Sequence, residues 1–230
     1  MKDLDGYIRF FGPTSPRWAP LSTQLPAGFS RGGFGANCNE IAYSTGYLSR
    51  NPANRQTLVA AGVHTPLSAL LIDPLATAEA KEWAAVALSN FSADPANLQP
   101  LVAAGVHTPL SALLIDPLAT AEAKEWAAVA LENLSLDPAN RQTLVAAGVH
   151  NQLSALLIDH QATPDAKEFA AEALGNLSCD LANRRPLVVD GVHIPCELLR
   201  NRQATPDAKQ WSVGALGSLE PTPRGCCVIS

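Results

Sequence analysis

The stretch from Leu58 to Leu88 reads LVAAGVHTPLSALLIDPLATAEAKEWAAVAL, and Leu101 to Leu131 repeats it letter for letter. Glycines recur in the same register every 43 residues along the chain, at Gly62, Gly105, Gly148 and Gly191. Self-similarity at a fixed period of this length is typical of a solenoid, in which each unit buries its apolar face against its neighbours. The identity of the two units also indicates recent duplication or deliberate consensus construction.

Capping residues and prolines divide each unit into three helices. In the first unit, Asn51-Pro52 supplies an N-cap followed by proline at the first helical position, and Gly62 supplies the left-handed residue that often ends a helix. Thr65-Pro66 repeats the opening signal, and Thr77 caps the third and longest helix. The sequence therefore predicts a first helix over residues 53–61 and a second that opens at Thr65-Pro66 and breaks at Asp73-Pro74. The third, capped by Thr77, runs to about Phe91.

Two segments of the unit carry a family resemblance. Residues 54–63 (NRQTLVAAGV) and residues 84–91 (AAVALSNF) resemble the N-x-x-x-L-V-x-A-G and A-A-x-A-L-x-N-L signatures of armadillo repeats. The resemblance extends from about residue 39 to residue 219, and it departs from the family at His64-Thr65-Pro66, where an apolar residue usually precedes the proline. It implies an all-α fold, a right-handed armadillo-type alpha-alpha superhelix of about four three-helix repeats.

The sequence predicts three regions. Residues 1–36 are rich in proline and glycine, which break helices, and we expect a flexible arm there. Residues 37–219 form the predicted solenoid, whose N-terminal end is a partial repeat over residues 39–50. Four repeats follow near residues 51–93, 94–136, 137–179 and 180–219, and residues 220–230 form a C-terminal tail.

Composition and charge exclude several classes of protein. The net charge is −5 and no long basic run is present, which argues against nucleic acid as a partner and favours a neutral or mildly basic peptide. Charged residues interrupt every apolar run before it reaches the length of a transmembrane helix. The five cysteines include no Cys-x-x-Cys pair and follow no secretory signal, so we expect a reducing, cytoplasmic environment.

The family resemblance also implies a binding surface. Armadillo solenoids stack their third helices along a concave face that holds an extended peptide, and asparagines on this face grip the peptide backbone. The residues of this sequence that match are Asn90, Asn133 and Asn176. An aromatic side chain lies seven residues before each of these asparagines, and an equivalent one follows in the fourth unit, giving Trp83, Trp126, Phe169 and Trp211. These seven residues are the candidate partner-binding site.

Each ladder also has a purely structural interpretation. The aromatic rings could fill the space between stacked third helices, and the asparagines could form hydrogen bonds between repeats. In nuclear-import adaptors of the importin-alpha type, a tryptophan usually lies four residues before the asparagine. Here Val86, Val129 and Glu172 occupy that place, so the transfer of an import function is in doubt.

Recurring histidines and lysines suggest no further chemistry. Histidines one repeat apart are separated by roughly 10 Å, given usual helix-packing distances. A zinc–nitrogen bond is only about 2 Å long, so two such histidines cannot share an ion and we expect no metal or other cofactor. The lysines Lys81, Lys124, Lys167 and Lys209 are interpreted as solvated helix faces. No nucleophile, phosphate-binding or zinc-protease motif is present, which favours a protein that is not an enzyme and has no small-molecule substrate.

The last residues form a candidate lipidation motif. Cys227-Val228-Ile229-Ser230 fits the prenylation pattern, in which a terminal serine favours a farnesyl group. The adjacent Cys226 could carry a palmitoyl chain, and two lipids anchor a protein more stably than one.

The leading hypothesis is a protein-binding scaffold that holds a partner peptide and is tethered to the cytosolic face of a membrane through Cys227. The alternatives are a soluble importin-alpha-like cargo or nuclear-transport adaptor, with the nucleus as a possible location, and a non-catalytic subunit of a ubiquitin ligase.

Overall fold

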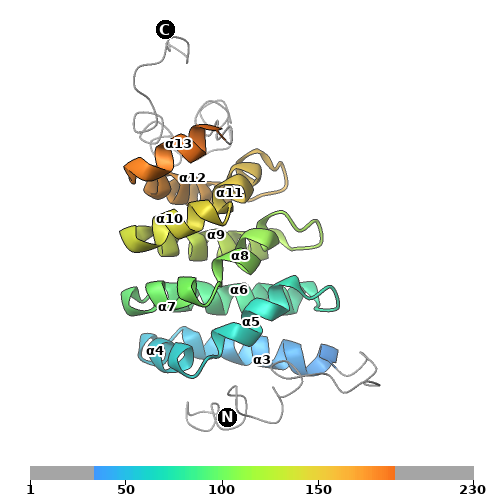
Figure 1. Ribbon diagram of the computed structural model, residues 1–230. Coiled ribbons are helices and arrows are strands. Elements are labelled where there is room, and N and C mark those ends of the chain that lie inside the picture. The colour runs from blue at the N-terminus through green and yellow to red at the C-terminus, as the bar shows by residue number, and fades with distance from the viewer. Residues whose placement is uncertain (1–33, 190–230) are drawn as a thin grey trace, which may run out of the picture.

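The computed structural model describes residues 34–189, which form eleven α-helices and one short 3₁₀ helix. Four layers are stacked on one another, as Figure 1 shows. The helix bounds, in chain order, are α3 Phe34–Ser49, α4 Pro52–Ala60, α5 His64–Ile72, α6 Ala78–Ser92, η2 Pro95–Asn97, α7 Leu98–Ala103, α8 His107–Leu114, α9 Ala121–Leu136, α10 Pro138–Ala146, α11 Val149–Ile158, α12 Pro164–Ser178 and α13 Leu181–Val189.

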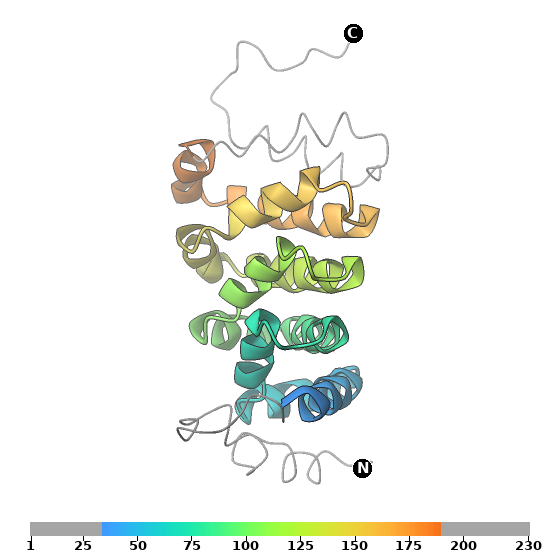
Figure 2. The same ribbon diagram turned by 90° about the vertical axis from the view of Figure 1, so that its right-hand side faces the viewer.

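Helices of the same kind form rows that run through the stack. The third helices of successive repeats, α3, α6, α9 and α12, pack side by side and form the most extensive contacts in the described part of the chain. The second helices α5, α8 and α11 cover this row, and the first helices α4, α7, α10 and α13 lie in a separate column, as the rotated view in Figure 2 shows. The predicted all-α repeat architecture is confirmed over these residues.

The glycine after each first helix adopts the left-handed conformation that the sequence predicts. Gly62, Gly105 and Gly148 all have a φ of 76°. An added Cβ at Gly105 would meet no atom within 4 Å, so the backbone conformation rather than crowding favours glycine there. The chain thereby turns directly from the first helix of each unit into the second.

The helix caps confirm most of the predicted boundaries. The Asn51 side chain accepts a hydrogen bond from the Ala53 backbone N–H at 3.1 Å, and Thr77 Oγ1 accepts one from the Ala80 N–H at 3.1 Å. The predicted cap at Thr65 is wrong: α5 begins at His64, so Thr65 lies inside its first turn, and the residue before the helix makes no side-chain cap. The turn at Gly62 leads straight into helical backbone, which leaves no extended residue for a cap to occupy.

The first helix of the second unit is divided into η2 and α7, whereas the first and third units have one continuous helix here. Pro100 stands where the first unit has Thr57, and a proline cannot donate the backbone hydrogen bond that a helix interior requires. The proline alone does not divide the helix, because α13 is continuous over Leu181–Val189 with Pro186 at the equivalent position.

An asparagine in each first helix joins that helix to the third helix before it. Asn97 and Asn140 are buried, and their Nδ2 atoms donate to the backbone oxygens of Phe91 and Leu134, each at 3.1 Å. These oxygens belong to the last turns of α6 and α9, where carbonyls have no helical partner. The first asparagine of the repeat signature therefore has a structural role.

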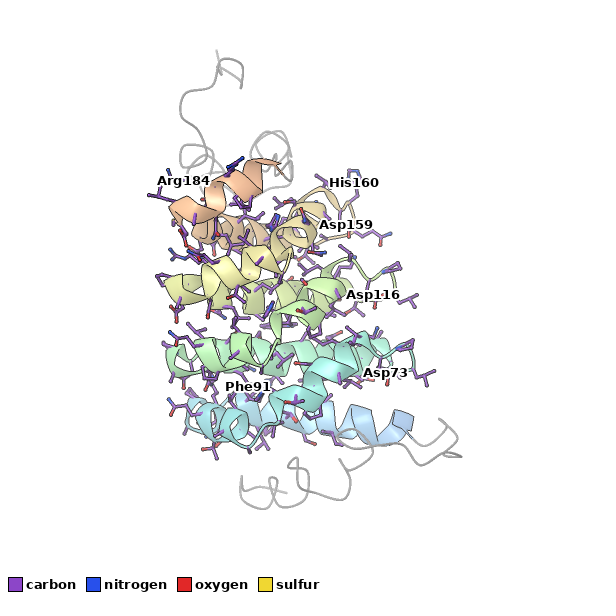
Figure 3. All side chains as sticks on the ribbon, viewed as in Figure 1. Asp73, Phe91, Asp116, Asp159, His160 and Arg184 are labelled. Atoms are coloured by element: carbon purple, nitrogen blue, oxygen red, sulfur yellow. The ribbon has the colours of Figure 1, made fainter. Side chains whose placement is uncertain are left out.

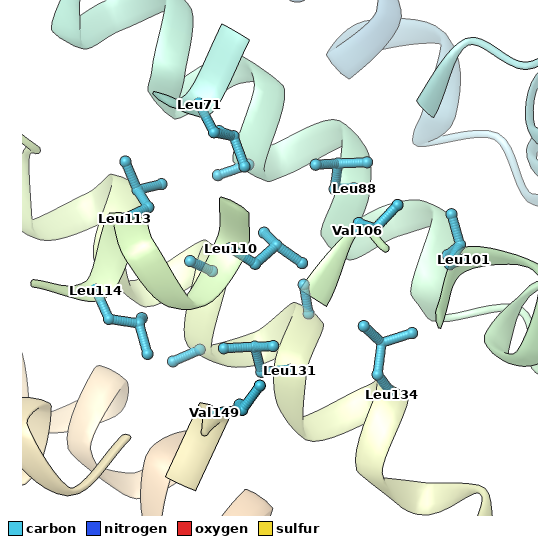
Figure 4. Packing of buried hydrophobic residues seen from close by; sticks show 14 of the residues in the cluster. Leu71, Leu88, Leu101, Val106, Leu110, Leu113, Leu114, Leu131, Leu134 and Val149 are labelled. Atoms are coloured by element: carbon cyan, nitrogen blue, oxygen red, sulfur yellow. The ribbon is translucent and has the colours of Figure 1, made fainter. Parts of the chain in front are cut away.

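The core consists mainly of leucine and alanine, with some valine and with Phe91 as its largest fully buried side chain. Leu88 and Leu131, at equivalent positions in α6 and α9, are fully buried, and Figure 4 shows them among the leucines of the neighbouring helices. Small alanines on the buried sides of α6 and α9 let these helices approach closely. The cluster is continuous from Ile41 to Leu187, so each unit completes the core of the next.

The N-terminal boundary of the solenoid lies slightly earlier than the sequence predicts. Helix α3 begins at Phe34, inside the arm predicted for residues 1–36. It packs on α6 as the later third helices pack on one another, so it occupies the place expected for the partial repeat over residues 39–50.

Candidate functional site

One stripe of each third helix faces away from the core. In α6, residues 84–88 are buried, whereas Trp83 and Asn90 remain partly exposed and Ala93 just beyond the helix is exposed. The equivalent residues of α9 and α12 lie beside them in the same row. We define this surface, formed by the outward stripes of α3, α6, α9 and α12, as the third-helix face. It carries six of the seven residues predicted to bind a partner, and the seventh, Trp211, lies outside the described residues.

The predicted asparagine ladder also links neighbouring repeats. Each asparagine donates from Nδ2 to a serine Oγ in the preceding third helix: Asn90 to Ser49 at 3.0 Å, Asn133 to Ser92 at 3.3 Å and Asn176 to Ser135 at 3.0 Å. The inter-repeat hydrogen bond that the sequence left open as an alternative is therefore present in all three cases. One such bond uses only part of the capacity of a carboxamide, which has two donor hydrogens and an acceptor oxygen.

The aromatic ladder packs between repeats as well as facing solvent. Trp83, Trp126 and Phe169 are partly buried and contact the apolar core. The Trp83 ring lies against α3, where an added Cβ on Gly46 would come within 2.7 Å of the ring. Tyr43 meets Trp83 edge-on at a centroid distance of 4.7 Å, and the Arg50 guanidinium lies 5.7 Å from the ring centroid. Trp83 is thus held by two aromatic-type contacts and by close packing on α3.

A pair of glutamates was not assigned a role from the sequence. Glu132 lies on α9, and the charge of Glu172 on α12 acts on it. Burial, followed by the Glu172 charge, raises the pKa of Glu132 to about 7, while a hydrogen bond with Asn176 partly opposes the shift. The sequence could have pointed to this pair, because both glutamates depart from the repeat. The equivalent residues one repeat earlier are Ser89 and Val129, which carry no charge.

The two ends of the third-helix face differ in chemistry. At the α3 end, Tyr43 and Tyr47 are more than half exposed, and Arg50 directly follows the same helix. At the other end, α9 and α12 contribute Glu132 and Glu172 beside the asparagines. The third-helix face therefore has an aromatic end with one cation and an acidic end, so its two ends are chemically distinct.

Comparison with known proteins agrees with this architecture. No protein-family model matches the sequence, and a search of curated proteins finds no match. Among solved structures, a computationally designed armadillo repeat protein for modular peptide recognition aligns with a TM-score of 0.69 at 24% identity, covering 79% of this chain and 75% of the other. A designed armadillo repeat protein in complex with the peptide (KR)4 aligns with a TM-score of 0.66 at 24% identity, covering 80% and 76%. The fold is that of an armadillo-repeat solenoid.

The prediction that the recurring lysines lie on solvated helix faces is wrong for Lys81, Lys124 and Lys167, which are buried in this armadillo solenoid. The fourth, Lys209, lies outside the described residues. Lys81 and Lys124 are about 6% exposed, and their Nζ atoms contact the carboxylates of Asp116 and Asp159 at 2.8 and 2.9 Å. Each pair joins a third helix to the loop of the next repeat, 35 residues later in the sequence. A buried ammonium group requires a carboxylate partner, and here the neighbouring repeat provides that carboxylate.

The histidine ladder lies at the start of the second helices. His107 and His150 are buried, and burial lowers the pKa of His64 and His107, because a charged imidazole is poorly solvated there. No group of three side chains suited to a metal ion is found over residues 34–189. In the same part of the armadillo solenoid, no helix has the length and apolar character needed to cross a membrane. The lipidation candidates Cys226 and Cys227 lie outside the described residues.

Proposed function

We propose that this armadillo solenoid is a protein-binding scaffold whose third-helix face holds an extended, basic segment of a partner protein. The proposal assigns the chain no catalytic step. It rests on the chemistry of the face described above, and the designed armadillo protein bound to the peptide (KR)4 is a structural precedent at the level of the fold.

The observation that carries the proposal is the glutamate pair. Burial raises the pKa of Glu132 to about 7, and repulsion from the Glu172 charge adds to this shift. A lysine or arginine side chain placed between them would remove that repulsion and form charge-assisted hydrogen bonds with both carboxylates. The acidic end of the face thus favours a cationic residue of the partner.

The asparagines would bind the backbone of the same segment. Their bonds to Ser49, Ser92 and Ser135 hold the carboxamides in fixed orientations. A fixed carboxamide that still has an acceptor oxygen can receive a backbone N–H. At Asn90 and Asn133 the second hydrogen can also bind a backbone carbonyl. At Asn176 the second hydrogen is engaged by Glu132. The hydrogen bonds to serine are therefore compatible with peptide recognition, and they orient the asparagine side chains for it.

Fluorescence anisotropy with a labelled (Lys-Arg)4 peptide at pH 8 and low salt tests this function. We expect the double variant Glu132→Gln and Glu172→Gln to weaken binding by roughly tenfold or more, as removal of charge-assisted contacts does. The control is Glu79→Gln with Glu122→Gln, which removes the same charge from the first turns of α6 and α9, outside the acidic end of the face. Equal weakening in both double variants would mean that net charge alone attracts the peptide, and the proposal would be wrong.

The proposal includes a membrane tether. Cys227-Val228-Ile229-Ser230 would direct farnesylation of Cys227, with Cys226 as a second lipidation site, and would hold the scaffold on a cytosolic membrane face. This part rests on the sequence motif, which acts only at the C-terminus of a protein. Intact mass of the protein from a eukaryotic host should show a farnesyl adduct at Cys227 with residues 228–230 removed. An unmodified C-terminus would contradict the tether and leave a soluble adaptor for basic peptides.

A further inference from the structure

The loops between the second and third helices form one edge of the solenoid. Figure 1 shows these loops stacked in a column on the right, and Figure 3 labels Asp73, Asp116 and Asp159 within them. The edge also contains the last residues of α5, α8 and α11 and the first turns of α6, α9 and α12. None of the residues assigned to the third-helix face belongs to these loops.

Aliphatic side chains recur along this edge in the register of the repeat. Five of them are between 52% and 78% exposed, namely Ile72, Leu75, Ile115, Leu118 and Ile158, and we call this row the apolar ridge. Isolated apolar residues on a surface are ordinary, but aligned ones that form a continuous strip mark an interaction site more often. The ridge is broadest over the first two units, because Gln161 replaces the second leucine in the third.

The charges that flank the ridge have one sign. The segments 72–79, 115–122 and 158–165 contain six acidic residues and no lysine or arginine. Only Asp116 and Asp159 of the six are paired with lysines, whose ammonium groups are buried. The C-terminus of each second helix lies near the N-terminus of the following third helix, so the helix dipoles largely cancel and the formal charges determine the field. The surroundings of the ridge therefore favour a basic partner and oppose a second copy of this chain.

The spacing of the ridge favours a helical partner. Successive repeats are separated by roughly 10 Å, and an α-helix rises 1.5 Å per residue, so equivalent contacts recur about every seven residues of a helix. Residues seven apart lie on nearly the same side of a helix. In an extended strand the same distance takes about three residues, and residues three apart point to opposite faces. One turn of a polyproline helix also spans roughly 10 Å, but such helices bind grooves lined by aromatic residues. The ridge residues are all aliphatic.

We propose that the apolar ridge binds an amphipathic helix of a partner protein, with aliphatic residues in a heptad pattern flanked by lysine or arginine. The scaffold then has two independent binding surfaces, one for an extended basic segment and one for a basic amphipathic helix. A single partner, or two different ones, can occupy both surfaces together.

The test uses a labelled 21-residue peptide of leucine and lysine, with leucine at the first and fourth places of each heptad. Fluorescence anisotropy should show saturable binding that the double variant Leu75→Gln and Leu118→Gln weakens at least about tenfold, because two buried apolar contacts are lost. The third unit already carries Gln161 at this position, so the folded chain accepts the substitution. Circular dichroism and melting of the variant should match those of the original protein.

The matched control is Leu136→Gln with Leu181→Gln, which alters two exposed leucines away from the ridge, at the end of α9 and at the start of α13. Binding in this control should be unchanged, and so should binding in the Glu132→Gln, Glu172→Gln variant. A peptide of the same composition without the heptad pattern should bind much more weakly. The proposal is overturned if the ridge variant binds the heptad peptide as tightly as the control, or if the unpatterned peptide binds equally well. Neither result would bear on the binding of (Lys-Arg)4 to the third-helix face.

Discussion

The first two repeats share 31 consecutive identical residues and can be compared directly, Leu58–Leu88 with Leu101–Leu131. Features that depend on the unit itself are the same in both. Gly62 and Gly105 have the same left-handed φ, and Thr77 and Thr120 cap their helices with bonds of 3.1 and 3.0 Å.

Features that depend on the neighbouring repeat differ between the two units. Trp83 packs against Gly46 and Tyr43 of α3 and against Arg50, which follows that helix. For Trp126, the equivalent positions are Ser89 and Val86 of α6 and Ala93, which follows it. The identical sequence therefore forms the same turn and the same third-helix cap, although α8 ends one residue earlier in the register than α5. It acquires a different surface, because the third-helix face is built from residues of two units at a time.

The largest expected effect tests how far the two units are equivalent. Leu88→Ala and Leu131→Ala each remove a fully buried side chain, and each should lower the free energy of unfolding by about 3 kcal/mol. Chemical denaturation of both variants measures this loss. We expect the two losses to agree, since both leucines lie in the same continuous core. A difference as large as the loss itself would show that the two repeats do not share one cooperative core.

A smaller effect is expected from the ion pairs that join the repeats. Asp116→Asn and Asp159→Asn each leave a buried lysine without its counter-charge and should each cost about 1–2 kcal/mol, because the carboxylates are partly exposed. The lysine holds the pKa of Asp116 below its ordinary value, so this stabilisation is present above the pKa of the unfolded carboxyl and is lost as the pH falls through the lowered value. Stability curves between pH 2 and pH 7 should therefore be flatter at the acidic end for Asp116→Asn. An unchanged curve would contradict the role of the pair.

Substitution of Trp83 and Trp126 measures how much their different neighbours contribute to stability. Trp83→Ala should cost about 1 kcal/mol more than Trp126→Ala, because only the first also loses the contacts with Tyr43 and Arg50. The comparison of the two melting curves measures this excess. Tyr43→Ala should remove most of the excess in a double-mutant cycle, whereas equal losses at both tryptophans would show that the α3 contacts contribute nothing.

The smallest expected effect concerns the acidic end of the third-helix face. The pKa of Glu132 is about 7 in the folded protein, above that of an ordinary carboxyl, so the unfolded chain ionises first as the pH rises. Stability should therefore fall between about pH 5 and pH 8, by no more than about 1 kcal/mol because the group is partly solvated. Glu132→Gln should remove this fall, while Glu122→Gln, in the exposed first turn of α9, should leave it in place.

The sequence predicts the fold because its signals are local and repeated. A glycine at the left-handed turn, an asparagine or aspartate cap, a threonine cap and alanine–leucine helices occur in each unit, so the register is fixed several times over. The predicted helix cap at Thr65 was wrong for a local reason too. Thr65-Pro66 has the sequence of a cap followed by proline, but α5 already begins at His64.

The site could be predicted only in part. Spacing placed Trp83 and Asn90 on one stripe of the third helix, and only the family resemblance implied that this stripe faces outward; in the structure both residues are partly exposed. It could not show that Lys81 is buried, because its partner Asp116 lies in another repeat. The influence of Glu172 on Glu132 likewise depends on how α12 packs on α9, which no periodicity within one helix reveals.

The most direct test of the account is a nuclear magnetic resonance titration of the isotope-labelled protein with unlabelled (Lys-Arg)4. The side-chain amide signals of Asn90, Asn133 and Asn176 should shift together as the peptide is added, and the pKa of Glu132 should fall from its value of about 7 as a cation comes to lie beside it. Amide signals on the apolar ridge should stay where they are. If these three asparagines and Glu132 do not respond while the peptide binds, the third-helix face is not the binding surface and the central claim is wrong.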